Sequence, residues 1–549
     1  MSTTKYKNTQ YHYYHHHQSG TMAFAPNLDK PIGDLSPADL IWPKPFDINC
    51  TKPTNGKFDR NEMLSGGWGK IAIISPKQLH LNFGIPVKNV KVSNVINEAF
   101  DRLQSHLSVY DVNDVPYTRM HFIPLRKNVK DTWSKQLKNL PIQYTLVVVN
   151  LLEIGDNMDK TCFVTDNHVD ESYNMVIDRK DMDVVVEINA SSCVGVLRAL
   201  SSLQYSVEYI DTGKFIFGGL PIYIHDKPRF KWRGLMVDTS RHFIPLSRLK
   251  NVVDGMERLK LNVFHWHIVD SQSFPFESKI YPNLAAKGAY DDKNAVYRRD
   301  EIKDFIEYAG KRGVRIVPEF DLPAHTGSWG GLSIDAADTG LLVRCPNIVK
   351  ADERLMEHGV DKVALNPLHP KILKLLTPLL NEIFDLFPDN YIHFGGDEVN
   401  ADCWETNEQI KKWKANYEKV GNSVPWHSKL QGIFTKKIFK LAKTKNKRPI
   451  VWDDTLSITD LTEDHVVQWW RGWLPSQINI AHQRNLQTTS SVGYYLDDLS
   501  QSWQKMYQQT IDDSSSTLSL GGEAACWDEH ADDDNLDHRI FSRLPAVGK

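Results

Sequence analysis

The 549-residue sequence has few cysteines, almost no net charge and no long hydrophobic run. A membrane-spanning helix needs about 18 or more consecutive apolar residues, so the sequence predicts no membrane span. The 65 Lys and Arg residues against 68 Asp and Glu residues give a net charge of −3. Without a basic block, nucleic acid and acidic membrane surfaces are poor candidates for a partner. Hydrophobic residues at 41% and charged residues at 24% exclude a wholly disordered or collagen-like chain.

The cysteines are too few for a disulfide scaffold, and none lies in a C-x-x-C pair or at zinc-finger spacing. Two Asn-X-Ser/Thr triplets, at Asn49 and Asn189, fit glycosylation sites, although such triplets often arise by chance. The six cysteines are Cys50, Cys162, Cys193, Cys345, Cys403 and Cys526.

Composition and periodicity divide the chain into three parts. Residues 1–38 are polar and rich in His and Tyr, without the apolar core of a signal peptide, which predicts a disordered tail. Residues 39–225 mix short strands with helices and carry no catalytic cluster, which predicts a non-catalytic α+β domain. Its expected strands are Lys70–Ile74, Tyr144–Leu151 and Asp183–Asn189, and its expected helices are Val92–Leu107 and Cys193–Val207.

Residues 226–549 alternate apolar strands with helical stretches, such as Asp300–Lys311 and His369–Leu386. Eight such repeats predict an α/β fold, a (β/α)₈ TIM barrel. Only 22 residues (549 − 527) follow Trp527, so we expect a truncated eighth helix that leaves the first and last strands exposed. The eight expected strands are Gly234–Asp238, Asn262–Asp270, Val314–Asp321, Tyr391–Gly395, Pro449–Asp453, Val466–Trp470, Thr489–Tyr495 and Leu520–Trp527.

Polar and aromatic side chains accumulate where these strands end. The carboxyl ends of barrel strands form the active-site face, and packing alone does not explain so many polar residues there. The set comprises Asp238, Arg241, His265, His267, Asp270, Glu319, Asp321, His325, His393, Asp397, Glu398, Trp452, Asp453, Asp454, Trp469, Trp470, Tyr494, Tyr495, Asp497, Glu523, Trp527 and Glu529.

The string HFGGDE, His393 to Glu398, places two adjacent carboxylates after a Gly-Gly bend. Glycines allow a tight turn, so both side chains can face the site. Crowded carboxylates separate their pKa values, which provides an acid beside an anionic partner. Alternatively, Asp397 and Glu398 cap the N-terminus of a helix.

The string HWHIVD, His265 to Asp270, also has two interpretations. By strand alternation His265 and His267 share one face, and Trp266 and Ile268 share the other. The H-x-H pair could bind a metal, with His325 and His393 as the nearby candidates for further ligands. The pair could instead form a hydrogen-bonding layer that supports an acid.

Residues 230–547 resemble glycoside hydrolase family 20, the β-N-acetylhexosaminidases. The matching strings, in family order, are FKWRGLMVDTSRHFIP, NVFHWHIVDSQSFPFES, VRIVPEFDLPAHTGSWG, YIHFGGDEV, VVQWW, YYLD and GGEAACWDE. Upstream, IWPKP (Ile41–Pro45) and VLRALSSLQYSV (Val196–Val207) resemble the family's non-catalytic domain.

The resemblance implies a retaining exo-hydrolase that removes terminal β-linked GlcNAc or GalNAc, with the substrate's acetamido group as nucleophile. Glu398 would be the general acid/base, and Asp397 would stabilise the acetamido group. Tyr495 would donate to the acetamido carbonyl. His325 and Asp270 would form a supporting relay. No metal and no organic cofactor is implied.

The resemblance also implies a sugar-binding set. Charged side chains would bind the sugar hydroxyls, and indole rings would line the pocket, while Trp469 would face the other way. The hydroxyl-binding residues would be Arg241, Asp497 and Glu529, and the indoles would be Trp452, Trp470 and Trp527.

Substrates would be the glycan termini of N-glycans, glycolipids or chitin oligosaccharides. The resemblance further implies a lysosomal or secreted glycoprotein, admits a homodimer, and matches a family disulfide between Cys345 and Cys403. Family subunits that accept 6-sulfated sugars have Asn-Arg where this chain has Asp497 and Asp498, so we expect neutral substrates because carboxylates repel sulfate. Two alternatives stay open: an inactive carbohydrate-binding homologue, and a metal-dependent hydrolase using the H-x-H pair.

Overall fold

The computed structural model describes residues 71–108 (without positions 86 and 88), 142–152, 162–211, 214–218, 220–333, 340–346, 363–457, 461–511 and 516–548. These described residues all belong to one compact unit. The expected tail over residues 1–38, together with Asn49 and Cys50, lies outside the described residues.

The first described region contains two sheets. A five-stranded sheet has the order β2-β3-β5-β4-β8, in which β2, β3 and β5 are parallel and β4 runs antiparallel to its neighbours. A three-stranded antiparallel sheet has the order β1-β7-β6. The strands are β1 (Ile71–Ile74), β2 (Leu79–Phe83), β3 (Thr145–Leu151), β4 (Tyr173–Lys180), β5 (Asp183–Ala190), β6 (Glu208–Asp211), β7 (Lys214–Gly218) and β8 (Ile222–Asp226).

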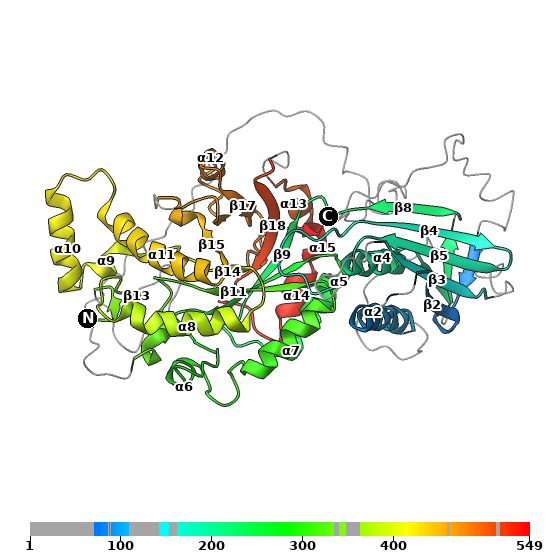
Figure 1. The fold of residues 1–549 in the computed structure, drawn as a ribbon, viewed down its shortest axis with the longest axis horizontal. Helices are drawn as coiled ribbons and strands as arrows, with labels where there is room; N and C mark the ends of the chain where they lie inside the picture. Colours follow the sequence, from blue (N-terminus) through cyan, green and yellow to red (C-terminus); the bar gives the residue numbers. More distant parts are fainter. Residues whose placement is uncertain are drawn as a thin grey trace, which may run out of the picture. The chain divides into compact units, whose positions relative to one another are not determined.

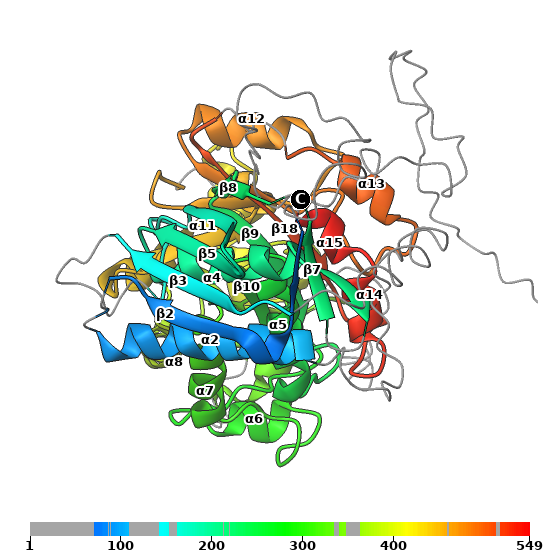
Figure 2. The same ribbon diagram turned by 90° about the vertical axis from the view of Figure 1, so that its right-hand side faces the viewer.

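Helices α2 (Val90–Ser108) and α4 (Cys193–Tyr205) pack against each other and against the five-stranded sheet, and α2 lies along β2 (Figure 2). Strand β3 buries every second residue, as expected for a sheet with one covered face. The expected strands and helices of this region are confirmed, with small shifts of their ends. A disulfide between Cys162 and Cys193, which the sequence analysis did not predict, ties the start of α4 to the preceding loop.

Eight parallel strands close into a barrel, which confirms the predicted fold. Helices such as α7 (Arg299–Gly310), α8 (Ile372–Leu386) and α11 (Trp426–Thr444) lie on the outside of these strands (Figure 1). The strands are β9 (Trp232–Asp238), β10 (Val263–Val269), β11 (Arg315–Phe320), β14 (Tyr391–His393), β15 (Arg448–Trp452), β16 (Val466–Trp469), β17 (Gln487–Ser490) and β18 (Ser519–Cys526).

Shorter elements connect the repeats. The antiparallel pair β12 (Leu342–Arg344) and β13 (Val363–Leu365) lies between β11 and α8. The disulfide Cys345–Cys403, implied by the family resemblance, is present and joins the segment after β12 to α9. The remaining helices are α5 (Leu246–Arg258), α6 (Asn283–Gly288), α9 (Ala401–Trp404), α10 (Glu408–Lys419), α12 (Ser476–Gln483), α13 (Trp503–Gln508), α14 (Leu536–Phe541) and α15 (Leu544–Val547).

The eighth helix is short, as expected, but the strands beside it are not exposed. Two helices, α14 and α15, follow β18, and Leu536, Ile540 and Leu544 are fully buried in the main hydrophobic core. Strand β9 is buried along its whole length, and β18 is buried after its first residue. The expectation of exposed edge strands is therefore wrong, because these two short helices supply enough apolar surface to cover them.

The barrel interior is layered. An apolar layer includes Trp232 of β9 and Tyr391 of β14, whose rings lie 5.7 Å apart although these strands are not neighbours. Above it lies a buried polar layer, in which His265 of β10 bonds Glu523 of β18, two strands away (2.7 Å), and Trp452 donates to Glu319 (2.8 Å). The barrel is therefore a packed core with polar groups directly below its carboxyl-terminal face.

Buried ion pairs join the α+β region to the barrel. Glu171 accepts from Arg198 at 2.8 Å and from Arg233 at 2.6 Å, and all three side chains are buried. Arg198 also donates to the backbone carbonyl of Gly313 at 2.7 Å. Removing one partner of such a network leaves an uncompensated buried charge, so the network fixes the two regions to each other.

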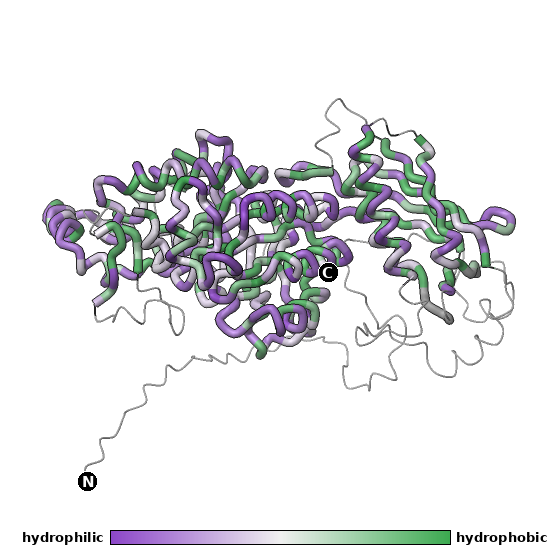
Figure 3. Tube along the Cα trace, turned by 90° about the horizontal axis from the view of Figure 1, so that it is seen from below, coloured by the Kyte–Doolittle hydropathy of each residue, from purple (hydrophilic) through white to green (hydrophobic). Residues whose placement is uncertain are grey.

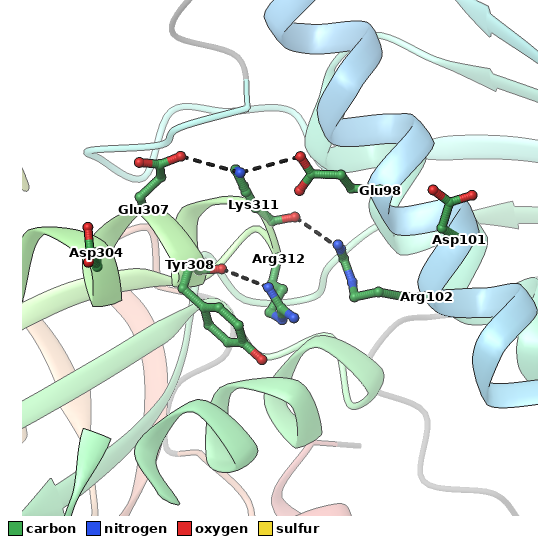
Figure 4. Close-up of a pocket in the computed structure, with 8 residues that line it drawn as sticks. All are labelled: Glu98, Asp101, Arg102, Asp304, Glu307, Tyr308, Lys311 and Arg312. Atoms are coloured by element: carbon green, nitrogen blue, oxygen red, sulfur yellow. Dashed lines mark hydrogen bonds and ion pairs between the residues drawn. The ribbon is translucent and has the colours of Figure 1, made fainter. Parts of the chain in front are cut away.

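A second contact between these regions surrounds a pocket of about 490 Å³ between α2 and α7 (Figure 4). Lys311 pairs there with Glu98 and Glu307, each at 3.3 Å, and Arg102 donates to the Lys311 carbonyl at 3.1 Å. None of the predicted site residues lines this pocket, so we interpret it as part of the interface.

Hydrophobic and hydrophilic residues alternate at short intervals along the described chain (Figure 3). Among the described helices, none combines the length and the hydropathy that a bilayer crossing requires.

Candidate active site

The Gly-Gly bend after β14 is fixed by Asp321, which follows β11. Gly395 and Gly396 have φ angles of +61° and +89°, which other residues rarely adopt. A Cβ atom at Gly395 would lie 2.0 Å from Asp321 Oδ1, and that oxygen accepts the Gly396 N–H at 2.8 Å. The close approach explains why the turn needs glycine. The two carboxylates that follow the turn, Asp397 and Glu398, both face His325.

Asp397 and Glu398 do not cap a helix, so that alternative is wrong. The next helix, α9, begins at Ala401, and its cap is Asn400, whose side chain accepts the Asp402 N–H at 2.9 Å. Glu398 instead has a φ of +50°, an uncommon conformation for a residue with a side chain. Strained backbone of this kind concentrates at functional sites.

One imidazole faces both carboxylates. His325 Nε2 lies 3.5 Å from Glu398 Oε2 and 3.9 Å from Asp397 Oδ2. His325 is buried and also has a positive φ, +55°. Burial acts to lower the pKa of His325, but Asp270 and Asp321 raise it well above the ordinary value.

The Asp397 carboxyl is disfavoured as an anion. It is 8% exposed, and its Oδ1 has no hydrogen-bond partner among the described residues. Burial, followed by the charges of Asp321, Asp454 and Glu398, raises the pKa of Asp397 well above its usual range, although His325 opposes the shift. Glu398 is more accessible, with a side chain that is 24% exposed.

Asp270 links several basic groups at the end of β10. Its Oδ1 accepts from His325 Nδ1 at 3.1 Å, and its Oδ2 accepts from His267 Nε2 at 2.8 Å. Arg241 approaches Oδ2 at 3.0 Å. Burial opposes ionisation, but Arg241 and His325 hold the pKa of Asp270 well below its usual range. The carboxylate is therefore a fixed anion.

Arg241 and Trp527 lie on the opposite side of Asp270 from His325. Arg241 also pairs with Asp238 at 3.1 Å, and its guanidinium lies 5.1 Å from the Trp527 ring centroid. A cation over an indole face at this distance is attractive. The arrangement holds Arg241 in place from two carboxylates and one ring.

Tyr495 is positioned by strand β18. It forms an isolated parallel bridge with Ala525, whose carbonyl accepts the Leu496 N–H at 2.7 Å. The predicted strand Thr489–Tyr495 therefore ends earlier, at Ser490, and Tyr495 lies in the following loop. Burial raises the pKa of the Tyr495 hydroxyl well above its ordinary value, so the hydroxyl remains a donor at neutral pH.

The remaining predicted binding residues occupy different environments. Burial and the charge of Glu529 raise the pKa of Asp497 to about 6, while Glu529 itself is exposed. Trp470 is partly buried and donates its indole N–H to Asp454 at 2.8 Å. Trp452 is 1% exposed, and its ring lies 6.1 Å from that of Trp527.

The histidines of HWHIVD favour the hydrogen-bonding interpretation over a metal site. His267 bonds carboxylates with both ring nitrogens, at 2.6 Å to Glu319 and 2.8 Å to Asp270. Donor atoms of His265, Glu319 and His393 lie within 4.8 Å of one another. However, the His265 and His393 rings stack with an interplanar angle of 24°, so their in-plane lone pairs do not converge on one ion.

No role was predicted from the sequence for Asp321, Glu319 or Glu523, although all three are among the strand-end residues. Each is completely or almost completely buried and accepts hydrogen bonds from a different strand or loop. The available signal was a carboxylate within or directly after an apolar strand, since such a group is rarely buried without a partner.

Comparisons with known proteins agree with this geometry. Residues 230–549 match the catalytic domain of glycosyl hydrolase family 20, and residues 41–205 match a domain described as beta-acetyl hexosaminidase like. The beta-hexosaminidase subunit beta of Homo sapiens is 34% identical over 389 residues, 69% of this chain and 66% of that protein. The subunit beta of Felis catus is 31% identical over 530 residues, covering 94% and 88%.

Among solved structures, the chitobiase of Flavobacterium johnsoniae superposes with a TM-score of 0.67 and 25% identity, covering 92% of this chain and 68% of that one. The chain belongs to glycosyl hydrolase family 20. It is therefore a glycosidase with a TIM barrel and a preceding α+β region.

Proposed function

We propose that the protein is a retaining exo-β-N-acetylhexosaminidase that removes terminal, non-reducing β-linked GlcNAc or GalNAc. The observation that carries this proposal is the position of His325, whose Nε2 faces Glu398 at 3.5 Å and Asp397 at 3.9 Å. Two adjacent carboxylates around one buried imidazole provide an accessible acid next to a more deeply buried partner.

Glu398 is the general acid and base. In the first step it protonates the glycosidic oxygen as the bond to C1 breaks and the acetamido oxygen closes onto C1. In the second step it takes a proton from the water that opens the resulting oxazolinium ring. The β-configuration is retained because C1 is inverted twice.

Asp397 and Tyr495 act on the acetamido group. Burial and neighbouring carboxylates raise the pKa of Asp397, and a positive charge that forms beside it offsets this effect because it favours the carboxylate form. Asp397 therefore accepts the acetamido N–H and stabilises the oxazolinium. The Tyr495 hydroxyl, kept protonated by burial, donates to the acetamido carbonyl and directs its oxygen toward C1.

The sugar ring is held by charged and aromatic groups. Arg241, Asp497 and Glu529 bind its hydroxyls, and charged hydrogen bonds of this kind are specific where water is excluded. Trp470 and Trp527 line the pocket, and the buried Trp452 supports Trp527 from below.

We further propose that the natural substrates are glycan termini of glycoproteins, glycolipids or chitin oligosaccharides, and that the protein acts as a lysosomal or secreted glycoprotein. The two disulfides favour an oxidising compartment. Of the two glycosylation triplets, Asn189 lies within β5, paired with Asn150 of β3 and Asn174 of β4.

The test compares an aryl β-N-acetylglucosaminide with the matching aryl β-glucoside, for the wild type and Glu398→Gln. Activity on the first substrate only, lost in the variant, supports the proposal. Asp402→Asn, which neutralises an exposed carboxylate four residues further on, is the matched control and should retain wild-type activity. Equal hydrolysis of both substrates, or full activity of Glu398→Gln, would overturn the assignment.

A further inference from the structure

A line of polar contacts runs from the accessible carboxylate of Glu398, through the 3.5 Å ion pair with His325, into the centre of the barrel. His325 Nδ1 meets Asp270 Oδ1 at 3.1 Å, and Asp270 Oδ2 meets His267 Nε2 at 2.8 Å. His267 Nδ1 then meets Glu319 Oε2 at 2.6 Å. The line extends beyond the His325–Asp270 relay by two fully buried residues from neighbouring strands, β10 and β11.

His267 is an imidazolium in this arrangement. Each of its ring nitrogens faces a carboxylate oxygen, and a neutral imidazole carries only one N–H, so one contact would otherwise join two acceptors. Burial acts to lower the pKa of His267, but Glu319, Asp270 and Asp238 raise it to about 10. The Trp527 ring also packs against His267, with its centroid 4.9 Å away, edge to face.

The imidazolium completes the coordination of Asp270. Oδ2 receives His267 and Arg241, while Oδ1 receives His325 and the Ser271 backbone N–H at 2.5 Å. With both oxygens doubly occupied, the carboxylate plane cannot rotate. The direction in which His325 Nε2 points at Glu398 is then determined by the barrel core, and the strained φ of His325 is maintained by these contacts.

We propose that His267 is a positioning residue for the general acid: anchored by Glu319, it orients Asp270 and through it the His325 imidazole that faces Glu398. This inference rests on the proposed function. Glu319 itself is kept in place by Trp452, which donates to Oε1 at 2.8 Å. The buried polar layer of the barrel thus supports acid catalysis in addition to filling the core.

His265 provides a matched control on the same strand. It is as deeply buried as His267 and also contacts Glu319, at 3.1 Å, but its other partner is Glu523 and it does not touch Asp270. Replacing either histidine by Gln removes one imidazole from the same polar layer. Only replacement of His267 removes the imidazole partner of Asp270 Oδ2 and leaves Arg241 as its remaining partner.

The experiment measures kcat and KM for wild type, His267→Gln and His265→Gln on two aryl β-N-acetylglucosaminides, with 4-nitrophenol and phenol as leaving groups. A poor leaving group depends more on protonation by the acid. We expect His267→Gln to lower kcat roughly tenfold more for phenol than for 4-nitrophenol, with KM little changed. His265→Gln should lower kcat equally for both.

Equal losses with both leaving groups in His267→Gln would overturn the inference and leave the proposed function intact. An inactive but folded wild type would overturn both. If His267→Gln does not fold, Glu319→Gln is measured in the same way. The amide oxygen of Gln can still accept a hydrogen bond from His267, but the substitution removes the negative charge that anchors it. Neutron diffraction of the wild type provides a test without mutation: a single deuteron on the His267 ring would contradict the inference.

Discussion

Arg241 and Asp270 form a 3.0 Å ion pair, and through it the proposed sugar-binding side of the site contacts the proposed acid relay. Asp270 receives Arg241 on one oxygen and His325 on the other. Only Asp270 and His325 lie between Arg241 and Glu398 along this path, so in the proposed mechanism sugar binding and acid catalysis depend on the same carboxylate.

Arg241→Lys tests whether sugar binding and acid catalysis both depend on Asp270. A lysine amine is a single point charge and cannot donate to Asp238 and Asp270 in the same fork geometry. We expect kcat/KM to fall by roughly 100-fold or more, the consequence of disturbing a buried charge pair, with changes in both kcat and KM. Arg248→Lys, at a partly exposed pair with Asp537 on the outside of the barrel, should change neither. An effect of Arg241→Lys on KM alone would contradict the coupling.

Substrate charge is the second prediction. Asp498 is partly exposed beside Asp497 and accepts from Ser500 N–H at 2.9 Å and Gln501 at 3.1 Å. Two carboxylates should repel a 6-sulfate. The double variant Asp497→Asn/Asp498→Arg should raise the ratio of activity on 6-sulfated over unsulfated aryl substrate. Asp533→Arg makes the same Asp-to-Arg change at an exposed position elsewhere and should leave the ratio unchanged. An unchanged ratio in the double variant would refute the prediction.

Acid stability should depend on Glu171. Burial opposes ionisation, but Arg233 and Arg198 lower the pKa of Glu171 to about 2, from 4.5. Because the folded pKa is depressed, the stabilisation is complete above pH 4.5 and is lost as pH falls toward 2. The shift corresponds to about 3 kcal/mol.

Urea unfolding between pH 3 and 7 measures this effect. Glu171→Gln should be less stable than wild type by about 3–5 kcal/mol at pH 7, and the difference should shrink below pH 4.5. Glu277→Gln, at a partly exposed pair with Arg298, should cost less than about 1 kcal/mol. A pH-independent difference for Glu171→Gln would contradict the pKa assignment.

Thiol counting tests the two disulfides. The chain has six cysteines, and Cys162–Cys193 and Cys345–Cys403 account for four of them. Denatured protein should therefore titrate four fewer thiols without reductant than with it. Equal counts in protein prepared under oxidising conditions would refute both bonds. Cys526, which is free and fully buried, should react only after unfolding.

The barrel was predictable because its parallel strands are buried on both faces and read as apolar runs ending in polar residues. The helices that cover β9 and β18 could not be predicted from the sequence, because α14 and α15 are too short to show a clear helical period. Within the site, the turn at Gly395 and Gly396 was visible in the sequence. Its partner Asp321 lies about 75 residues away, and only the closed barrel brings the two segments together.

The hydrogen bonds that support the site also form only when the barrel closes. His267 could be placed on one strand face by alternation, but the metal and hydrogen-bonding interpretations could be separated only once Glu319 and Asp270 were seen at its two nitrogens. The pairing of Cys162 with Cys193 likewise had no local signal, since a disulfide requires only that two chain segments meet in space.

The central claim, attack by the substrate's own acetamido group, is tested most directly by fluorinating that group. The measurement is kcat/KM for aryl glycosides carrying acetyl, monofluoroacetyl, difluoroacetyl and trifluoroacetyl groups on the 2-nitrogen. Each fluorine withdraws electrons from the carbonyl oxygen, so kcat/KM should fall at every step in wild type. A value independent of fluorine number would show that the acetamido oxygen does not attack C1 and would contradict the roles proposed for Asp397 and Tyr495.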